Sequence, residues 1–168
     1  PLKAISAFAP PMNTQDFNLN KAQEVHPAFT SYEEGMEAAA KMGKPVLIDF
    51  TGFGCVNCRK MEAAVWTDPQ VAEKLTKDYV LISLYVDDKT PLPEPVEVVK
   101  PDGTKRTLRT VGDKWSHLEE TKFGFLAQPF YVTVDNEGNP LSGSFVYKED
   151  IPGYMEFLEK GLENYRNR

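Results

Sequence analysis

Three stretches of the chain are almost continuously apolar, which is typical of strands that are covered on both faces of a sheet. They cover residues 45–50, 79–86 and 128–134. Asp49 is the exception in the first stretch, and a carboxylate at such a position is costly to bury in its charged form. A helical pattern separates the first two stretches, so we expect a βαβ unit with parallel strands.

Helical spacing of apolar residues predicts five helices. Residues 31–42 begin at Thr30 or Ser31, each with a Glu three positions later, which predicts a capping box, and Gly43 should end this helix. The other four helices are expected at residues 55–66, 69–78, 112–122 and 151–165.

Turn residues predict two hairpins and two irregular segments. Residues 96–99 and 104–110 flank a Pro-Asp-Gly turn, and residues 141–147 should pair antiparallel with the strand before them. Residues 89–95 read as a proline-rich break. We expect residues 1–27 to form a linker or N-terminal arm that packs, if at all, through Phe8, Phe17 and Leu19, and residues 28–168 to form the domain.

Composition narrows the class of protein without naming a function. The chain has 168 residues, of which 41% are hydrophobic, and a net charge of −6. This length suits one domain, and the mixed charges argue against nucleic-acid binding. No apolar run approaches the roughly 20 residues of a membrane helix. The chain starts at Pro1, so we expect a processed product or a piece of a longer protein.

The only two cysteines, Cys55 and Cys58, lie two residues apart where a predicted helix begins. A helix start lowers the pKa of a thiol, because unpaired N–H groups and the helix dipole favour the thiolate. Cys55 could therefore attack a partner disulfide, and Cys58, one turn on, could resolve the mixed disulfide. His26 and His117 look isolated, so we expect no metal site, and we expect no cofactor.

Three further residues are candidates for this chemistry. Asp49 and Glu62 would raise the pKa of Cys58 or relay its proton, although Glu62 reads equally well as a solvated helix charge. Pro129 reads either as a proline at the start of a strand or as a cis-proline that exposes the backbone of Gln128 to a substrate strand.

The chain resembles the thioredoxin superfamily. The resemblance rests on VLIDF at 46–50, CVNCRK at 55–60, QPFYV at 128–132 and DNEG at 135–138. It is more specifically similar to the C-terminal domain of DsbD-type thiol:disulfide interchange (cytochrome c biogenesis) proteins, through DFTGFGCVNCRKME at 49–62 and TDPQV at 67–71.

The resemblance implies an α/β, three-layer thioredoxin-like fold with a central mixed sheet flanked by helices. It also implies that Cys55 attacks, that Cys58 resolves, that Asp49 and Glu62 tune the site, and that Pro129 is cis. The implied location is periplasmic or exported, as the soluble end of a membrane protein that passes electrons to it. We therefore expect a monomeric reductant or electron relay acting on protein disulfides. The alternatives are an oxidase or isomerase, or a non-catalytic binding module.

The chain departs from the family pattern at three points. Gly54 replaces the tryptophan that usually precedes the first cysteine, with Phe53 one place earlier, and both residues should shape the surface on which a partner docks. Residues 89–127 are longer than in a minimal thioredoxin, which predicts an inserted hairpin and helix before the cis-proline strand. The chain also contains no membrane segment.

Overall fold

A four-stranded mixed sheet forms the centre of the protein, in a computed structural model that describes residues 25–168. The strand order is β3-β2-β6-β7, with β2 parallel to β3 and the other pairs antiparallel. The strands of this sheet are β2 (Val46–Thr51), β3 (Val80–Tyr85), β6 (Phe130–Val134) and β7 (Pro140–Val146). The parallel β2–β3 pair confirms the predicted βαβ unit.

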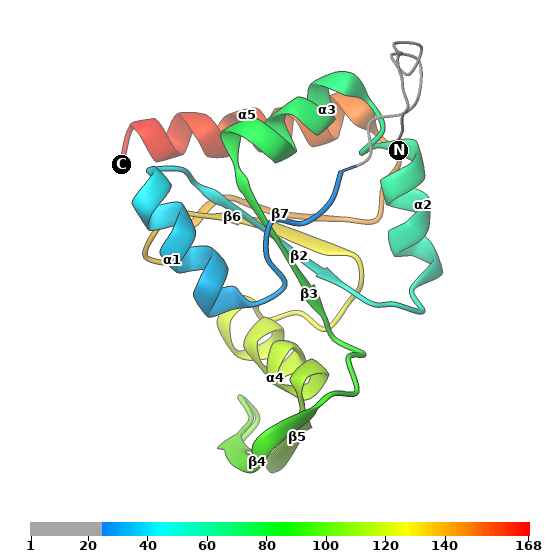
Figure 1. The fold of residues 1–168 in the computed structure, drawn as a ribbon, viewed down its shortest axis with the longest axis vertical. Helices are drawn as coiled ribbons and strands as arrows, with labels where there is room; N and C mark the ends of the chain where they lie inside the picture. The colour runs from blue at the N-terminus through cyan, green and yellow to red at the C-terminus, as the bar shows by residue number, and fades with distance from the viewer. Residues whose placement is uncertain (1–24) are drawn as a thin grey trace, which may run out of the picture.

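Helices cover both faces of the sheet and produce the predicted three layers (Figure 1). They are α1 (Tyr32–Met42), α2 (Val56–Ala64), α3 (Pro69–Glu73), α4 (Val111–Leu118) and α5 (Ile151–Arg166); α3 and α4 continue as the π-helical turns η3 (Lys74–Asp78) and η4 (Glu119–Phe123). One core cluster packs side chains of α1 and α4 on the sheet, and a second packs α2, α3 and α5 on the opposite face.

The side chains of β2 point alternately to the two faces of the sheet, and this decides which of them meet α2, the helix that carries Cys58. Ile48 and Phe50 belong to the cluster under α1 and α4, whereas Leu47 belongs to the cluster under α2, α3 and α5. Because side chains of a strand point alternately to its two faces, Asp49 shares the face of Leu47. The strand therefore places a fully buried carboxyl on the face that α2 covers.

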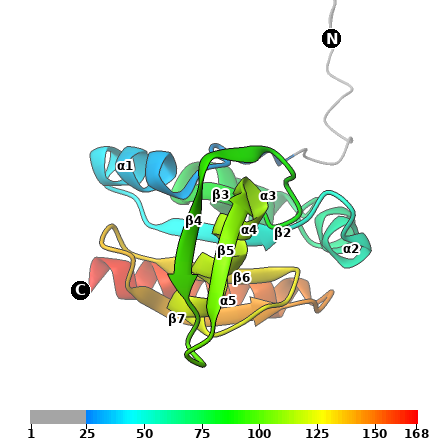
Figure 2. The same ribbon diagram turned by 90° about the horizontal axis from the view of Figure 1, so that it is seen from below.

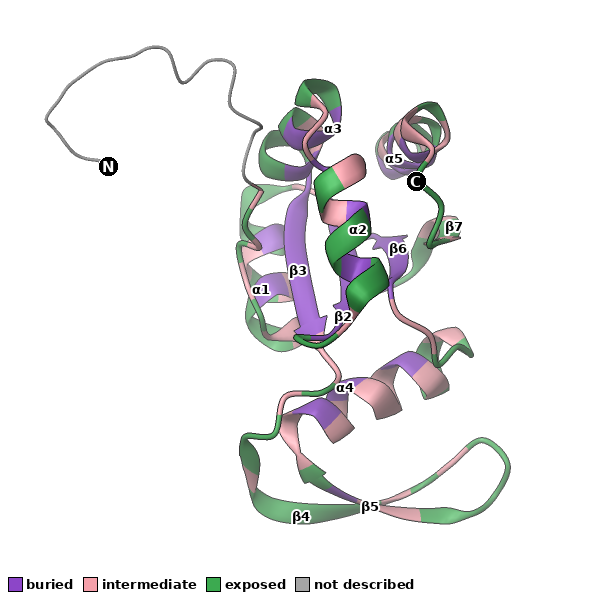
Figure 3. Ribbon diagram, turned by 90° about the vertical axis from the view of Figure 1, so that its right-hand side faces the viewer, coloured by how far each residue is buried: buried purple, intermediate pink, exposed green. Residues whose placement is uncertain are grey.

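The predicted insertion is a two-stranded hairpin followed by α4. Strands β4 (Pro91–Val99) and β5 (Lys105–Thr110) pair antiparallel with each other and not with the main sheet. In Figure 2 the hairpin lies nearest the viewer, in front of α4 and the sheet, and Figure 3 shows α4 between the hairpin and the sheet. Most of the surface of the hairpin is exposed (Figure 3).

Residues 89–95 correct one prediction, because they are not simply a break. Strand β4 already begins at Pro91, and its prolines alternate at positions 91, 93 and 95. The carbonyl of Thr90 accepts a hydrogen bond from the N–H of Val111, so the next residue, Pro91, faces the outer edge of the hairpin. On that edge a strand loses no ladder bond to a proline.

The start of α1 corrects a second prediction. Ser31 occupies the N-cap position, but its side chain accepts no capping hydrogen bond. Its hydroxyl instead donates to Oε1 of Glu33 at 3.3 Å, so the predicted capping box does not form. The predicted end of the helix is confirmed, because Gly43 adopts the left-handed conformation with φ of 67°.

The predictions for the N-terminal segment can be compared with the structure only from residue 25 onward. Phe29 forms an isolated parallel bridge with Ile82, so the chain at this position lies at the edge of the sheet beside β3 before it enters α1. Phe8, Phe17 and Leu19 lie outside the described residues, and the division into residues 1–27 and 28–168 stays a prediction. None of the helices within residues 25–168 is both long and apolar enough to cross a membrane.

Candidate functional site

Cys55 and Cys58 form a disulfide at the start of α2, with their Cα atoms 5.3 Å apart. Cys55 is the N-cap residue, and the backbone N–H of Cys58 donates to its sulfur at 3.1 Å. Only 1% of Cys58 is exposed, whereas Cys55 is half-buried. The two cysteines are therefore unequal, since solvent reaches Cys55 and hardly touches Cys58.

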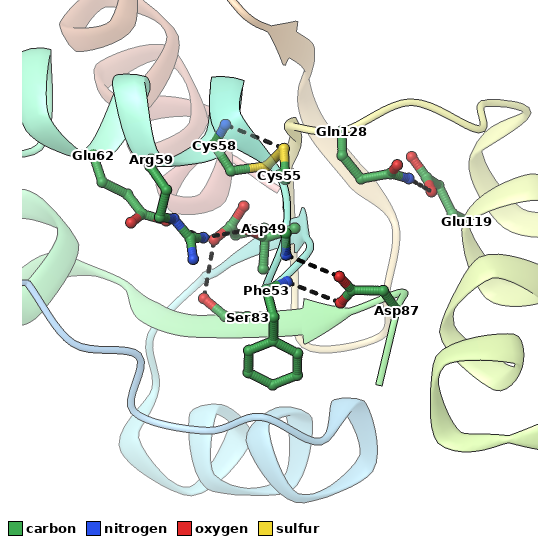
Figure 4. Close-up of a disulfide and its surroundings, with 12 residues drawn as sticks. Asp49, Phe53, Cys55, Cys58, Arg59, Glu62, Ser83, Asp87, Glu119 and Gln128 are labelled. Atoms are coloured by element: carbon green, nitrogen blue, oxygen red, sulfur yellow. Dashed lines mark hydrogen bonds and ion pairs between the residues drawn. A yellow bond between two sulfur atoms is a disulfide. The ribbon is translucent and has the colours of Figure 1, made fainter. Parts of the chain in front are cut away.

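The loop before Cys55 is held by Asp87, which follows β3. Its carboxylate accepts hydrogen bonds from the backbone N–H groups of Phe53 at 2.8 Å and Gly54 at 3.0 Å (Figure 4). Slight burial opposes ionisation, but these N–H groups hold the pKa of Asp87 below its ordinary value. An ionised Asp87 thus fixes the backbone that leads into the cysteine pair.

Phe53 and Gly54 lie at the surface beside the pair. Phe53 is 62% exposed and stacks on the ring of Tyr85 at a centroid distance of 4.1 Å. A Cβ atom at Gly54 would meet only Oδ2 of Asp87, at 3.8 Å. The site therefore has room for a side chain at position 54, and it presents its aromatic ring from position 53 instead.

Asp49 is buried between the sheet and the cysteine helix, and 1% of it is exposed. Its Oδ2 accepts a hydrogen bond of 3.0 Å from the hydroxyl of Ser83, the residue opposite it in the β2–β3 register. Burial raises the pKa of Asp49 to about 7, against the lowering effect of that hydrogen bond. In Figure 4, Asp49 lies between Ser83 and the cysteine pair.

Glu62 lies on α2 one turn after Cys58 and is tied to Arg59. Nη2 of Arg59 is 2.9 Å from Oε2 of Glu62 and also donates to the hydroxyl of Thr51 at 3.0 Å. Burial raises the pKa of Glu62, and the Arg59 guanidinium opposes that rise. Glu62 is thus a half-buried, paired carboxylate and not the freely solvated charge that was one interpretation of the sequence.

A cleft of about 500 Å³ opens beside the ion pair of Arg59 and Glu62. It is lined by Arg59, Glu62, Trp66, Ser83 and Tyr85, among others. Ser83 bonds directly to Asp49, so the cleft brings solvent to within one side chain of the buried carboxyl. The cleft thus approaches the Asp49 carboxyl from the side of α2 that carries Glu62.

Gln128 and Pro129 precede β6 and are joined by a cis peptide bond. The side chain of Gln128 points away from the disulfide toward Glu119, and its Nε2 donates to Oε1 of Glu119 at 3.2 Å (Figure 4). The backbone of Gln128 is thereby left as the part of the residue that can face a partner.

The structure brings the predicted cysteines and Asp49 together and adds residues that sequence reasoning missed. The missed residues are Ser83, Arg59, Asp87 and Glu119. For Glu119 a signal was present, because Val111, Trp115 and Glu119 recur at intervals of four, which puts all three on one helix face. Within residues 25–168 no group of three or more His, Cys, Asp or Glu side chains is placed to hold a metal ion.

Comparisons with known proteins agree with this geometry. A family described as thioredoxin-like matches residues 28–108. The thiol:disulfide interchange protein DsbD of Pseudomonas fluorescens is 30% identical over 58% of this chain and 21% of the relative. DsbD of Ralstonia nicotianae is 36% identical over 33% of this chain and 9% of the relative. The match thus spans about a fifth of the first relative's length and less of the second's.

Solved structures give the same fold. A DsbH oxidoreductase aligns with a TM-score of 0.60 and 18% identity, covering 91% of this chain and 94% of the other. The C-terminal domain of Neisseria meningitidis DsbD, in its reduced form, aligns with a TM-score of 0.55 and 17% identity, covering 79% and 98%. At these identities the likeness establishes the fold, which is thioredoxin-like as predicted.

Proposed function

Because this chain carries a thioredoxin-like domain with a cysteine pair at a helix start, we propose that it is a thiol–disulfide oxidoreductase. In its reduced form it would donate two electrons to a disulfide of a partner protein, as a reductant or an electron relay. The observation that carries the proposal is the unequal exposure of the two cysteines. Cys55 is half-buried and receives the N–H of Cys58, whereas Cys58 is almost completely buried.

The reaction consists of two exchanges. The Cys55 thiolate attacks one sulfur of the partner disulfide, forming a mixed disulfide and releasing the partner's other sulfur as a thiolate. Cys58 then loses its proton and attacks the sulfur of Cys55, which breaks the mixed disulfide and releases the second partner thiolate. The products are the Cys55–Cys58 disulfide and a partner dithiol, so the partner gains the two electrons that the cysteine pair loses.

Asp49 is proposed to take the Cys58 proton in the second exchange, with Glu62 assisting. Burial raises the pKa of Asp49 to about 7, so near neutral pH it can both accept and return a proton. The pairing of Glu62 with Arg59 keeps a second carboxylate next to this route. Both negative charges also disfavour a Cys58 thiolate, so a transfer of its proton to Asp49 lowers the cost of the second exchange.

The partner is proposed to bind across Phe53, Gly54, Gln128 and Pro129. Phe53 offers an exposed ring, and the absence of a side chain at Gly54 leaves the approach to Cys55 open. The backbone of Gln128 would pair with an extended segment of the partner, which gives affinity without demanding a particular sequence.

Trapping tests the proposal directly. Cys58→Ser should accumulate a mixed disulfide with partner proteins through Cys55, whereas the matched variant Cys55→Ser should accumulate none. The unmodified protein should reduce insulin with dithiothreitol as the electron source. Absence of both a trapped partner and insulin reduction contradicts the proposal and leaves a binding module as the alternative.

The reduction potential of the pair separates a reductant from an oxidase or isomerase. A value near that of thioredoxin, about −270 mV, supports a reductant, and a value near about −120 mV supports an oxidant. Equilibration with glutathione or thioredoxin redox couples gives this value.

Further proposals concern the cellular location of the protein, its oligomeric state and the source of its electrons. We propose a monomer in the periplasm, or exported, that receives electrons from a membrane electron-transfer domain of the same protein. Light scattering of the purified chain checks the monomer. An alkaline phosphatase fusion to the full-length protein checks export, and an inactive fusion would contradict a periplasmic location.

A further inference from the structure

Glu119 is an ionisable residue that the proposed reaction does not use, yet it is completely buried. It begins η4, in the segment between the inserted hairpin and β6. Burial raises the pKa of Glu119 to about 7, even though two hydrogen bonds favour its ionised form. A carboxyl in such a position is costly unless its oxygens have partners.

Both partners of the Glu119 carboxyl belong to the loop that ends at Pro129. Oε2 accepts the backbone N–H of Ala127 at 3.2 Å, and Oε1 accepts Nε2 of Gln128 at 3.2 Å. The backbone carbonyl of Glu119 also accepts the N–H of Phe125 at 3.5 Å. One residue of the insertion thus contacts this short loop at three points.

The loop at residues 124–128 contains no helix or strand, so side-chain bonds must supply much of its order. It presents exposed apolar side chains at Phe125 and Leu126, which are 43% and 54% exposed. It ends at Gln128, whose backbone would receive the partner strand. A loop that receives a partner strand binds that partner more weakly if the loop must first become ordered.

We propose that Glu119 is a positioning residue for partner binding, which fixes the backbone of Ala127 and Gln128 before a protein disulfide arrives. The inference rests on the proposed function and assigns part of its binding surface to the inserted segment. Glu119 touches neither sulfur, so it acts on how a protein partner binds and not on the exchange of sulfurs.

The test compares three variants of the full chain. Glu119→Leu removes both acceptors at similar volume. Glu119→Gln keeps one acceptor for Ala127 and can donate to the Gln128 amide once that amide is turned over. Glu163→Leu makes the same change on an exposed face of α5 and serves as the control. Each variant is assayed with insulin and with a small aromatic disulfide, which needs no backbone pairing.

We expect Glu119→Leu to raise KM for insulin about tenfold, the size expected for losing a hydrogen bond to a charged group. Its kcat for insulin and its rate with the small disulfide should stay within about twofold of the unmodified protein, and Glu119→Gln and Glu163→Leu should behave like the unmodified protein. An unchanged KM in Glu119→Leu, or an equal loss with both substrates, overturns the inference.

Gln128→Ala provides a second test if Glu119→Leu does not fold. It removes the hydrogen bond between the Gln128 amide and Glu119, and Gln128 is only half-buried, so the change disturbs the core less. It should raise KM for insulin in the same direction, and an unchanged KM overturns the inference. If the unmodified protein reduces neither substrate, the proposed function fails and the inference fails with it. If the unmodified protein is active and only the variants lack the KM effect, the inference alone fails.

Discussion

The buried carboxyl of Asp49 accepts a 3.0 Å hydrogen bond from the hydroxyl of Ser83 on the neighbouring parallel strand. This bond opposes the effect of burial, which raises the pKa of Asp49 to about 7. Ser83→Ala should therefore raise that pKa further, by up to about one unit, because a hydrogen bond to the charged form is lost. Titration of the Asp49 carboxyl by NMR checks this, with Ser144→Ala on β7 as the control. An unmoved titration midpoint would contradict the role of Ser83.

The raised pKa of Asp49 predicts that stability falls as pH rises. Between the ordinary value of 3.8 and about 7, the folded protein keeps a proton that the unfolded chain has lost. The free energy of unfolding should fall across this range, by on the order of 4 kcal/mol at most from Asp49, and stay low above it.

Asp49→Asn should remove the Asp49 part of this dependence and should be the more stable protein at pH 8. Urea unfolding of the oxidised protein at pH 5 and pH 8 measures the difference. Glu119, whose pKa burial also raises to about 7, should leave a residual dependence in Asp49→Asn that Glu119→Gln reduces. Equal pH dependence in Asp49→Asn and the unmodified protein would show that the carboxyl does not titrate as expected.

Neutralising both acids should lower the pKa of the buried thiol. In Asp49→Asn with Glu62→Gln, two negative charges near Cys58 are removed, so its thiolate becomes less costly. Thiolate absorbance near 240 nm, or alkylation rate against pH, reports the titration of the reduced pair. Glu34→Gln, an exposed acid on α1, controls for the loss of a negative charge alone. An unchanged thiol titration in the double variant removes both acids from the mechanism.

Two glycines before Cys55 should respond differently to the same change. A Cβ at Gly52 would lie 3.2 Å from Oδ2 of Asp87, which is already held by two N–H groups, whereas at Gly54 the distance is 3.8 Å. Gly52→Ala should cost about 1 kcal/mol, and Gly54→Ala should be neutral or stabilising by about 0.5 kcal/mol, because it restricts the unfolded chain. Thermal unfolding of the two variants compares them directly, and equal losses would contradict the steric argument.

Sequence alone predicted most of the fold, because the strands and helices carry strong local patterns. Continuous apolar residues located β2 and β3, and Gly43 located the end of α1. The hydrogen bonds of the site could not be predicted from the sequence in the same way. Asp87 looks like an ordinary surface charge, and its role depends on the N–H groups of Phe53 and Gly54, more than thirty residues away in the chain. The capping box failed for a local reason, since the Ser31 hydroxyl bonds to the side chain of Glu33 instead of accepting a backbone N–H.

The prolines of β4 have a consequence for how the protein behaves at high concentration. The outer edge of the hairpin lacks an N–H donor at Pro91. An exposed strand edge normally recruits a strand from another molecule, and prolines on the edge prevent a complete ladder. The hairpin can therefore extend from the domain with an outer edge that, at Pro91, resists pairing with a strand of another copy.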